Sequence, residues 1–204
     1  MSSYPTIRDP KNDHLLTPEN SALVIIDYQP VQVNSINSMP RAELIENIVT
    51  VAKVAVGYKL PIILSTVNKK NGDTIKVLRD VLGNIPSYER TAINSWEDKE
   101  FVEAVKKTGR KKLIMTALWT EVCLSLPTLD ALHEGYEVYP VVDAVGGTSE
   151  IAHKVALKRM AQAGARLTTV AQFVCELQRD WNRAKTVPVM VDALVSVGAF
   201  LKSE

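Results

Sequence analysis

Short hydrophobic runs alternate along the chain with longer segments in which apolar residues recur at helical spacing. Five runs are rich in β-branched residues and are predicted strands: residues 22–27, 61–67, 112–118, 138–143 and 167–170. This alternation is typical of parallel strands joined by crossover helices. Because the runs are almost continuously apolar, both faces of the sheet are expected to be covered. The pattern predicts an α/β fold, a three-layer α/β/α sandwich with a mainly parallel, Rossmann-like sheet.

The segments between the strands supply the helices. Three of them place apolar side chains three and four positions apart: residues 41–58, 97–108 and 149–163. The second stops at Gly109 and the third at Gly164, and glycine is the residue that most often follows a helix. The third helix has Thr148 or Ser149 as its N-cap.

Two segments do not follow this alternation. Residues 68–95 contain Gly72, Gly83, Pro86 and scattered charges, which suggests a loop with a short helix. A loop of that length in one domain is more often functional than idle, so we expect substrate-facing residues there. The apolar segment 187–204 is either a helix packed on its own domain or part of a subunit interface.

Composition limits the function classes. A chain of 204 residues with 46% hydrophobic and 23% charged residues is an ordinary globular protein, predicted to be a single domain over residues 1–204. Its net charge of +1 provides no field to attract nucleic acid or an anionic membrane. We therefore expect a small-molecule substrate, with neither nucleic acid nor membrane as a partner.

The predicted location is cytoplasmic. The polar N-terminal stretch lacks the apolar centre of a signal peptide, and no segment approaches the roughly 20 apolar residues of a membrane span. Two cysteines, Cys123 and Cys175, suggest free thiols in a reducing compartment rather than a disulfide framework. Cys175 falls within a predicted helix and is expected to be structural.

Asp27 and Cys123 are the candidate reactive pair. Asp27 ends the first predicted strand, where open α/β sheets bind ligands, although an aspartate there could also cap a turn. Cys123 could be a small buried hydrophobe, but Pro127 requires a helix to begin close to it. At a helix N-terminus the thiol pKa should fall, and the backbone amides there can stabilise an oxyanion. The pair predicts a nucleophile beside a proton acceptor.

Three stretches of the chain carry a family resemblance. They are Val-Ile-Ile-Asp-Tyr-Gln ending at Gln29, Arg-Thr-Ala-Ile-Asn-Ser-Trp from Arg90 to Trp96, and Thr-Glu-Val-Cys ending at Cys123. Together they resemble the isochorismatase-like cysteine hydrolases, and within them the YcaC-like subgroup, over roughly residues 9–181. The resemblance implies a catalytic triad of Asp27, Arg90 and Cys123. The broader family usually has lysine as the basic member, whereas YcaC-like members have arginine.

The resemblance also implies how the site would work. Cys123 would attack an acyl carbon while Asp27 accepts the thiol proton, giving a thioester that water then hydrolyses. Arg90, which is permanently protonated, would act only electrostatically. A non-proline cis peptide is implied at Leu118-Trp119, with an oxyanion hole formed by the backbone N–H groups of Trp119 and Cys123.

Several other residues have both a functional and a structural interpretation. Tyr28, Trp96 and Trp119 could wall an apolar acyl pocket, but core packing explains each equally well. Asn94 could bind substrate or hydrogen-bond its own backbone. The residues expected to contact substrate are Tyr28, Asn94 and Trp96. The pair at Gly146 and Gly147 could form an anion nest, but a tight turn explains it better.

No metal or other cofactor is expected. Related nicotinamidases hold a metal through an Asp-x-His pattern with a further histidine. Here His14, His133 and His153 are far apart along the chain and lack ligand spacing.

Three functions remain open. The first is a cysteine-dependent hydrolase, an amidase acting on a small amide or related C–N acyl substrate. The second is an isochorismatase-type vinyl-ether hydrolase, which Cys123 disfavours because that chemistry does not use the cysteine. The third is a noncatalytic oligomeric scaffold or thiol sensor, in which Cys123 would be oxidised reversibly. For each of them the resemblance suggests a homo-oligomer.

Overall fold

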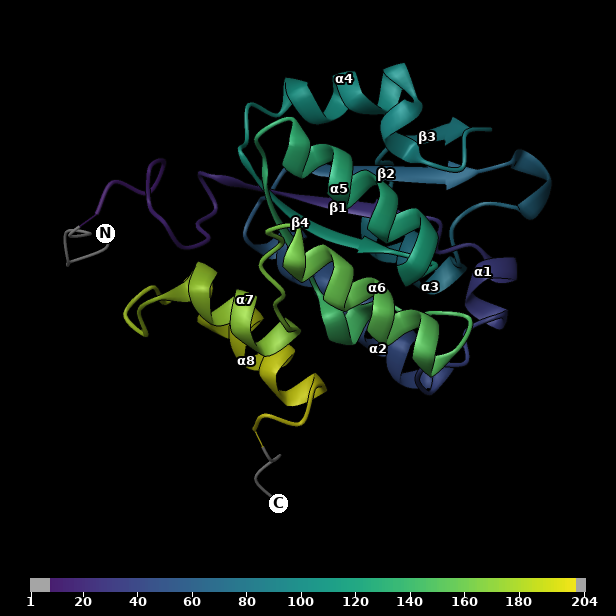
Figure 1. The fold of residues 1–204 in the computed structure, drawn as a ribbon. Coiled ribbons are helices and arrows are strands. Elements are labelled where there is room, and N and C mark those ends of the chain that lie inside the picture. Colours follow the sequence, from purple (N-terminus) through teal and green to yellow (C-terminus); the bar gives the residue numbers. More distant parts are fainter. Residues whose placement is uncertain (1–7, 201–204) are drawn as a thin grey trace.

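The computed structural model describes residues 8–200, without the side chain of Lys69, and has one sheet in its middle layer (Figure 1). Its five strands are β1 (Ser21–Ile26), β2 (Ile62–Val67), β3 (Ser87–Arg90), β4 (Lys112–Ala117) and β5 (Glu137–Pro140). The spatial order is β3-β2-β1-β4-β5, and every neighbouring pair is parallel. The order reverses at β1, which lies between β2 and β4. The predicted three-layer α/β/α sandwich with a parallel sheet is confirmed.

Helices cover both faces of this sheet. They are α1 (Pro30–Asn34), α2 (Arg41–Gly57), α3 (Lys76–Leu82), α4 (Lys99–Lys107), α5 (Ser125–His133), α6 (Glu150–Gln162), α7 (Val170–Gln178) and α8 (Val187–Ser196). On β1, Leu23 and Ile25 face a core shared with α2, α3, α7 and α8, whereas Val24 and Ile26 face a core shared with α4, α5 and α6. Side chains alternate between the two faces of a strand, so residues 22–26 of β1 are all apolar.

One predicted strand is wrong. Residues 167–170 make only an isolated bridge between Thr168 and Val141, although Arg166 and Thr168 donate backbone hydrogen bonds to β5. The pairing stops because the Thr169 hydroxyl accepts the Gln172 amide and starts α7. The apolar residues that suggested a strand therefore belong partly to the first turn of a helix.

The long connection 68–95 holds more structure than expected. It contains the predicted short helix, α3, and also β3, the edge strand paired with β2. The sequence Ser87-Tyr-Glu-Arg90 has no apolar run because an edge strand need not be buried on both faces. Arg90 consequently stands at the end of a strand and not in a loop.

The remaining predicted helices are present. Ser149 is the N-cap of α6, where its hydroxyl accepts the Ala152 amide. The chain enters a helix next to Cys123 through a π-helical turn, Thr120–Leu124, which leads into α5. The predicted segment 187–204 contains α8, which packs against α2 and α7 (Figure 1); residues 201–204 lie outside the described residues. Among residues 8–200, no helix has the length and apolar character to cross a membrane.

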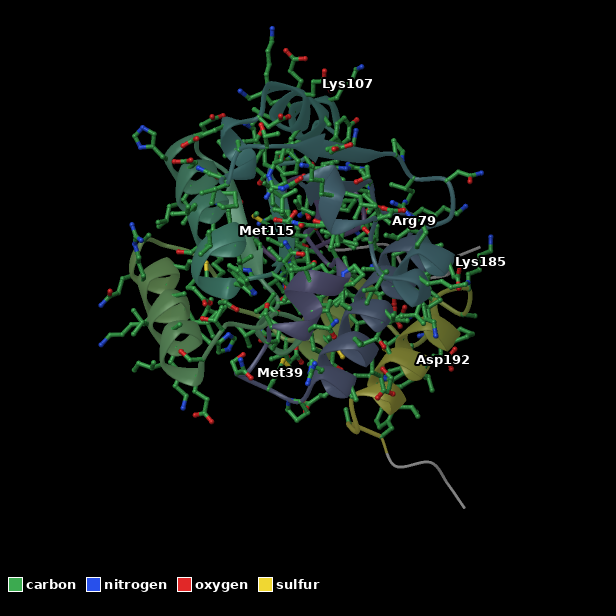
Figure 2. All side chains as sticks on the ribbon, turned by 90° about the vertical axis from the view of Figure 1, so that its right-hand side faces the viewer. Met39, Arg79, Lys107, Met115, Lys185 and Asp192 are labelled. Atoms are coloured by element: carbon green, nitrogen blue, oxygen red, sulfur yellow. The ribbon has the colours of Figure 1, made fainter. Side chains whose placement is uncertain are left out.

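The carboxyl ends of the strands share one edge of the sheet. The strand arrows of Figure 1 point to its right-hand side, which faces the viewer in Figure 2. In that view Met115 of β4 lies near the middle, while Lys107 and Asp192 lie at the periphery. Open α/β sheets bind ligands at this edge, beside the strand where the order reverses.

Candidate active site

Asp27 follows β1 at the carboxyl edge of the sheet. Its φ of 63° is left-handed, a conformation that aspartate adopts more readily than most residues. Its backbone N–H donates to Ser65 O of β2 at 3.0 Å, so the sheet still holds the residue while the chain turns. The side chain is fully excluded from solvent. A carboxylate buried this way needs a charged or hydrogen-bonding partner.

Arg90 is that partner. Its Nη1 and Nη2 atoms donate to Oδ1 and Oδ2 of Asp27 at 2.8 and 2.7 Å, which is the bidentate geometry of strong arginine–carboxylate pairs. Nη1 lies 3.5 Å from Ser65 Oγ, and Nη2 donates to Ile93 O at 3.3 Å. Burial lowers the pKa of Arg90, but its hydrogen bonds and Coulomb attraction to Asp27 outweigh burial and raise it overall.

Cys123 reaches the same pair from the strand on the other side of β1. It lies in the π-helical turn after β4, is only 7% exposed, and packs in the core that contains Trp96 and Ile26. Asp27 interacts with the thiol through its charge and a hydrogen bond, and Arg90 interacts with it through its charge. The structure thus brings together Asp27, Arg90 and Cys123, which are far apart in the sequence.

The expected lowering of the thiol pKa is wrong. The pKa of Cys123 is raised to about 12, mainly by burial and then by the charge and hydrogen bond of Asp27. The charge of Arg90 and a hydrogen bond from the Trp119 backbone act in the opposite direction but are weaker. Helix position alone suggested a thiolate, but burial and, after it, the adjacent carboxylate of Asp27 favour the protonated thiol.

The turn before Cys123 holds its backbone amides in place. The Leu118-Trp119 peptide bond is cis, as the resemblance implied. Trp119 O accepts the amides of Val122 and Leu124, both at 3.1 Å, and the indole Nε1 donates to Ser35 Oγ at 2.6 Å. The Trp119 backbone also acts on the Cys123 thiol and lowers its pKa. The oxyanion hole expected from the Trp119 and Cys123 amides stays a prediction.

The three residues expected to contact substrate are all engaged within the fold. Tyr28 is buried, and its hydroxyl donates to Ala144 O at 2.5 Å. Asn94 accepts the Trp96 amide through Oδ1 and donates to Asp130 through Nδ2. Trp96 donates through Nε1 to Glu134 at 2.9 Å and packs edge-on against two aromatic rings. Contact of these residues with substrate stays a prediction.

Ser65 is a site residue that sequence reasoning missed. It lies in β2 between Asp27 and Arg90, where its backbone O accepts the Asp27 amide and its hydroxyl donates to Tyr88 O at 2.9 Å. The same hydroxyl oxygen lies next to the Arg90 guanidinium. A serine near the carboxyl end of a mostly apolar strand was the available signal.

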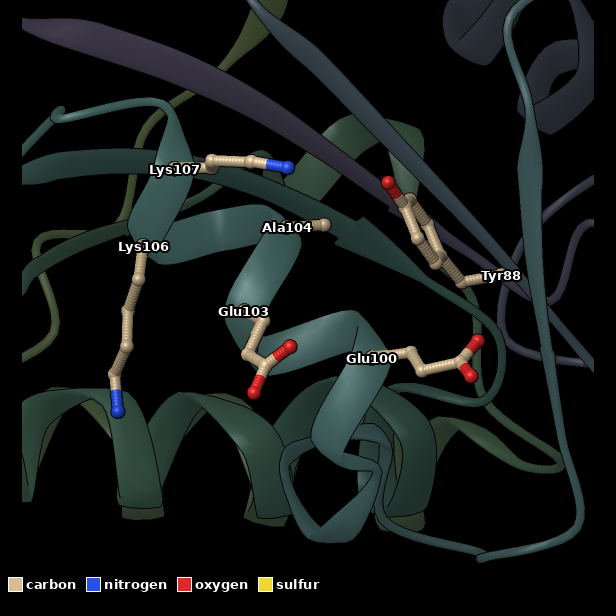
Figure 3. Close-up of a pocket in the computed structure, with 6 residues that line it drawn as sticks. All are labelled: Tyr88, Glu100, Glu103, Ala104, Lys106 and Lys107. Carbon is tan, nitrogen blue, oxygen red and sulfur yellow. The ribbon is translucent and has the colours of Figure 1, made fainter.

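Within residues 8–200, no group of three His, Cys, Asp or Glu side chains could hold a metal ion, and the absence of a metal stays a prediction. A hollow of about 530 Å³ lies between α4 and β3 (Figure 3). It is lined by Tyr88, Glu100, Glu103, Ala104, Lys106 and Lys107, which do not include the Asp27, Arg90 and Cys123 cluster.

Comparison with known proteins identifies the family. Residues 21–172 match the Isochorismatase domain. The chain belongs to the isochorismatase family. Members of this family most similar to it include the Escherichia coli K12 protein named "Probable hydrolase YcaC", which is 35% identical over 181 residues, or 87% of this chain and 84% of the relative. The chain is thus a hydrolase of the isochorismatase family, related to YcaC.

Several solved structures share its fold. YcaC from Pseudomonas aeruginosa, with hexane-2,5-diol and covalent acrylamide, has a TM-score of 0.81 and 32% identity, covering 91% of this chain and 98% of that one. Escherichia coli YcaC, described as an octameric hydrolase of unknown specificity, has a TM-score of 0.80 and 31% identity, with coverage of 93% and 98%. MAR1 ribonuclease from Caenorhabditis elegans has a TM-score of 0.78 and 26% identity, with coverage of 93% and 99%.

Proposed function

We propose that this isochorismatase-family hydrolase cleaves a small amide or related C–N acyl substrate through a thioester on Cys123. The observation that carries the proposal is the meeting of the Cys123 thiol with the paired Asp27 and Arg90 at the carboxyl edge of the sheet. The cluster combines a nucleophile, a proton acceptor and a fixed positive charge. Its charges also suggest the order of events.

In the first half-reaction, Cys123 Sγ bonds to the carbonyl carbon as its proton passes to Asp27. The buried pair of Arg90 and Asp27 is neutral overall, and a thiolate beside an ionised Asp27 would add a second buried anion. Proton transfer avoids this, because Asp27 becomes neutral while the sulfur becomes negative beside Arg90. The amides of Trp119 and Cys123 stabilise the oxyanion. The C–N bond then breaks, the Asp27 proton passes to the leaving nitrogen, and a thioester remains.

In the second half-reaction, water replaces the sulfur. Asp27, again a carboxylate, accepts a water proton as the oxygen bonds to the acyl carbon. The C–S bond breaks, the proton returns to the sulfur, and the acid is released. Arg90 does not exchange protons in either half, because its pKa is raised by Asp27 despite its burial.

One feature of the YcaC relatives supports this function, and another supports the expected assembly. The Pseudomonas aeruginosa protein carries covalent acrylamide, an electrophilic amide of the size proposed for the substrate. The Escherichia coli protein is octameric, which supports a homo-oligomeric state for this chain. A protonated, mostly buried thiol also argues against the sensor alternative, since redox-sensing cysteines have a low pKa and are accessible.

Ammonia release from a panel of small primary amides tests the function, together with intact-mass detection of an acyl adduct. We expect turnover and a transient adduct on Cys123 in the wild type, and neither in Cys123→Ala. Cys175→Ala is the matched control, because it removes an exposed thiol on α7 and should leave turnover unchanged. Ammonia release that persists in Cys123→Ala would exclude the thioester route. A wild type that peroxide oxidises at Cys123, but no amide acylates, would favour the sensor.

A further inference from the structure

Glu121 lies two residues before Cys123 in the π-helical turn, and the proposed mechanism does not use it. Its Oε1 accepts two hydrogen bonds from one residue, the Thr148 amide at 2.9 Å and the Thr148 hydroxyl at 2.6 Å. Its Oε2 is buried without a hydrogen-bond partner among the described residues. A carboxylate oxygen buried without a partner is costly, so folding alone does not favour this arrangement.

The segment that Glu121 binds is itself fixed to the start of the same turn. Gly146 O accepts the Thr120 amide at 2.9 Å, and Gly146 bridges to Leu118. On its other side, Gly147 O accepts the Asn37 amide at 3.0 Å and its N–H donates to Ser38 Oγ at 2.9 Å. Residues 146–148 therefore form a support between the nucleophile turn and the chain that follows α1.

Glu121 packs so closely against this support that position 147 has no space for a Cβ atom. A Cβ added to Gly147 would lie 2.7 Å from Glu121 Oε2 and 3.0 Å from His153 Cβ. The glycine pair thus permits close approach of the backbone, and Glu121 occupies the space that a side chain would need. His153 contributes on the same side, where its Nδ1 and Thr120 Oγ1 are 2.9 Å apart.

We propose that Glu121 is a positioning residue for the oxyanion hole. By binding Thr148, it fixes the middle of the turn, while Thr120 fixes its start through Gly146. The Trp119 and Cys123 amides lie on either side of Glu121, so their separation and direction depend on this anchor. This inference rests on the proposed thioester chemistry, because only acyl transfer places a negative oxygen between those amides.

Two reactions of the same sulfur separate positioning from folding. Acylation by p-nitrophenyl acetate forms an S–C bond, transfers the thiol proton to Asp27 and releases p-nitrophenolate through an oxyanion. Alkylation by iodoacetamide displaces iodide and forms no oxyanion. We expect Glu121→Ala to lower the ratio of the acylation rate to the alkylation rate at least tenfold, given about 10²- to 10³-fold for loss of a whole oxyanion donor. Glu121→Gln, which keeps the acceptor for Thr148, should restore the ratio to within about threefold of the wild type.

Two further variants show whether a change in the ratio comes from the contact between Glu121 and Thr148. Thr148→Val removes only the hydroxyl bond and should lower the ratio less than Glu121→Ala, and it gives an independent answer if Glu121→Ala unfolds. Glu150→Ala on α6 is the matched control, because its exposed carboxylate binds only the Lys154 side chain in the part of the chain described. An unchanged ratio in both Glu121→Ala and Thr148→Val would refute the positioning role alone. Absence of a p-nitrophenolate burst in the wild type would overturn the thioester route and this inference together.

Discussion

Arg90 binds both carboxylate oxygens of Asp27, and neither side chain has any exposed surface. The two residues come from the ends of β3 and β1, which flank β2 in the sheet. The proposed chemistry depends on this pair, because it combines a proton acceptor and a fixed cation in one neutral unit. The stability of the folded protein depends on the pair as well, since removing either member leaves a buried, unpaired charge.

Arg90→Met should therefore destabilise the protein by about 3–5 kcal/mol, the usual effect of breaking a buried ion pair. Arg90→Lys keeps the charge but loses the bidentate geometry, so its loss of stability should be smaller. Urea unfolding at neutral pH measures both.

The Arg79–Asp73 pair is a matched control for this measurement. It is also bidentate, with bonds of 3.0 and 2.7 Å, but it is partly exposed. Arg79→Met should cost about 0–1 kcal/mol, as surface pairs do. Equal losses for Arg90→Met and Arg79→Met would mean that burial of the Asp27–Arg90 pair has no energetic consequence.

Asp27→Asn should separate the reactivity of the thiol from turnover. It removes the charge and the hydrogen bond that help raise the pKa of Cys123, while Arg90 remains to lower it. At pH 8, iodoacetamide should alkylate Cys123 faster in Asp27→Asn than in the wild type, because more of the thiol is ionised. Amide hydrolysis should be lost, because no group accepts the proton. The measurements belong in a Cys175→Ser background, where Cys123 is the only thiol.

Slower alkylation in Asp27→Asn would contradict this account of the thiol pKa. It would mean that Asp27 already holds the proton in the resting enzyme, with the sulfur as a thiolate beside Arg90. The wild-type pH profile gives a second check. The alkylation rate should keep rising with pH beyond about 10, where the rate for an ordinary thiol of pKa 9.0 levels off, because the pKa of Cys123 is raised to about 12.

The fold could be predicted from the sequence where hydrophobicity dictates it. β1, β2 and β4 are buried central strands, so they are mostly apolar and easily recognised. β3 was missed because it is a short polar edge strand, and residues 167–170 were wrongly assigned because their apolar residues begin α7.

The site could be predicted only in part. Motifs brought Asp27, Arg90 and Cys123 into one prediction, but none of them indicates solvent access. The raised pKa of the Cys123 thiol arises from burial and a neighbouring charge, which are three-dimensional properties. The same holds for the contact between Glu121 and Thr148, which joins segments 27 positions apart in the chain.

The raised thiol pKa also predicts how stability changes in alkaline solution. Between pH 9 and 12 the unfolded chain loses the Cys123 proton while the folded protein keeps it, so the free energy of unfolding falls as pH rises. Below pH 9 both states carry the proton, so this thiol no longer makes stability depend on pH. Cys123→Ser has no thiol to ionise and should lose less stability over this range in urea unfolding at several pH values. Parallel curves for the two proteins would show that the thiol pKa is not raised.

Gly146 supports the nucleophile turn at a point where the sequence favoured a tight turn over an anion nest. A Cβ added there would lie 2.7 Å from Ile36 Cγ2, a buried atom with little freedom to move. Gly146→Ala should therefore destabilise the protein by about 1–3 kcal/mol through overpacking, and lower turnover by shifting the Thr120 amide that binds Gly146 O. Ile36→Ala removes the obstructing atoms but leaves a cavity, so the double variant should be more stable than the sum of the two single losses predicts. Strictly additive losses in urea unfolding would show that the two side chains do not compete for the same space.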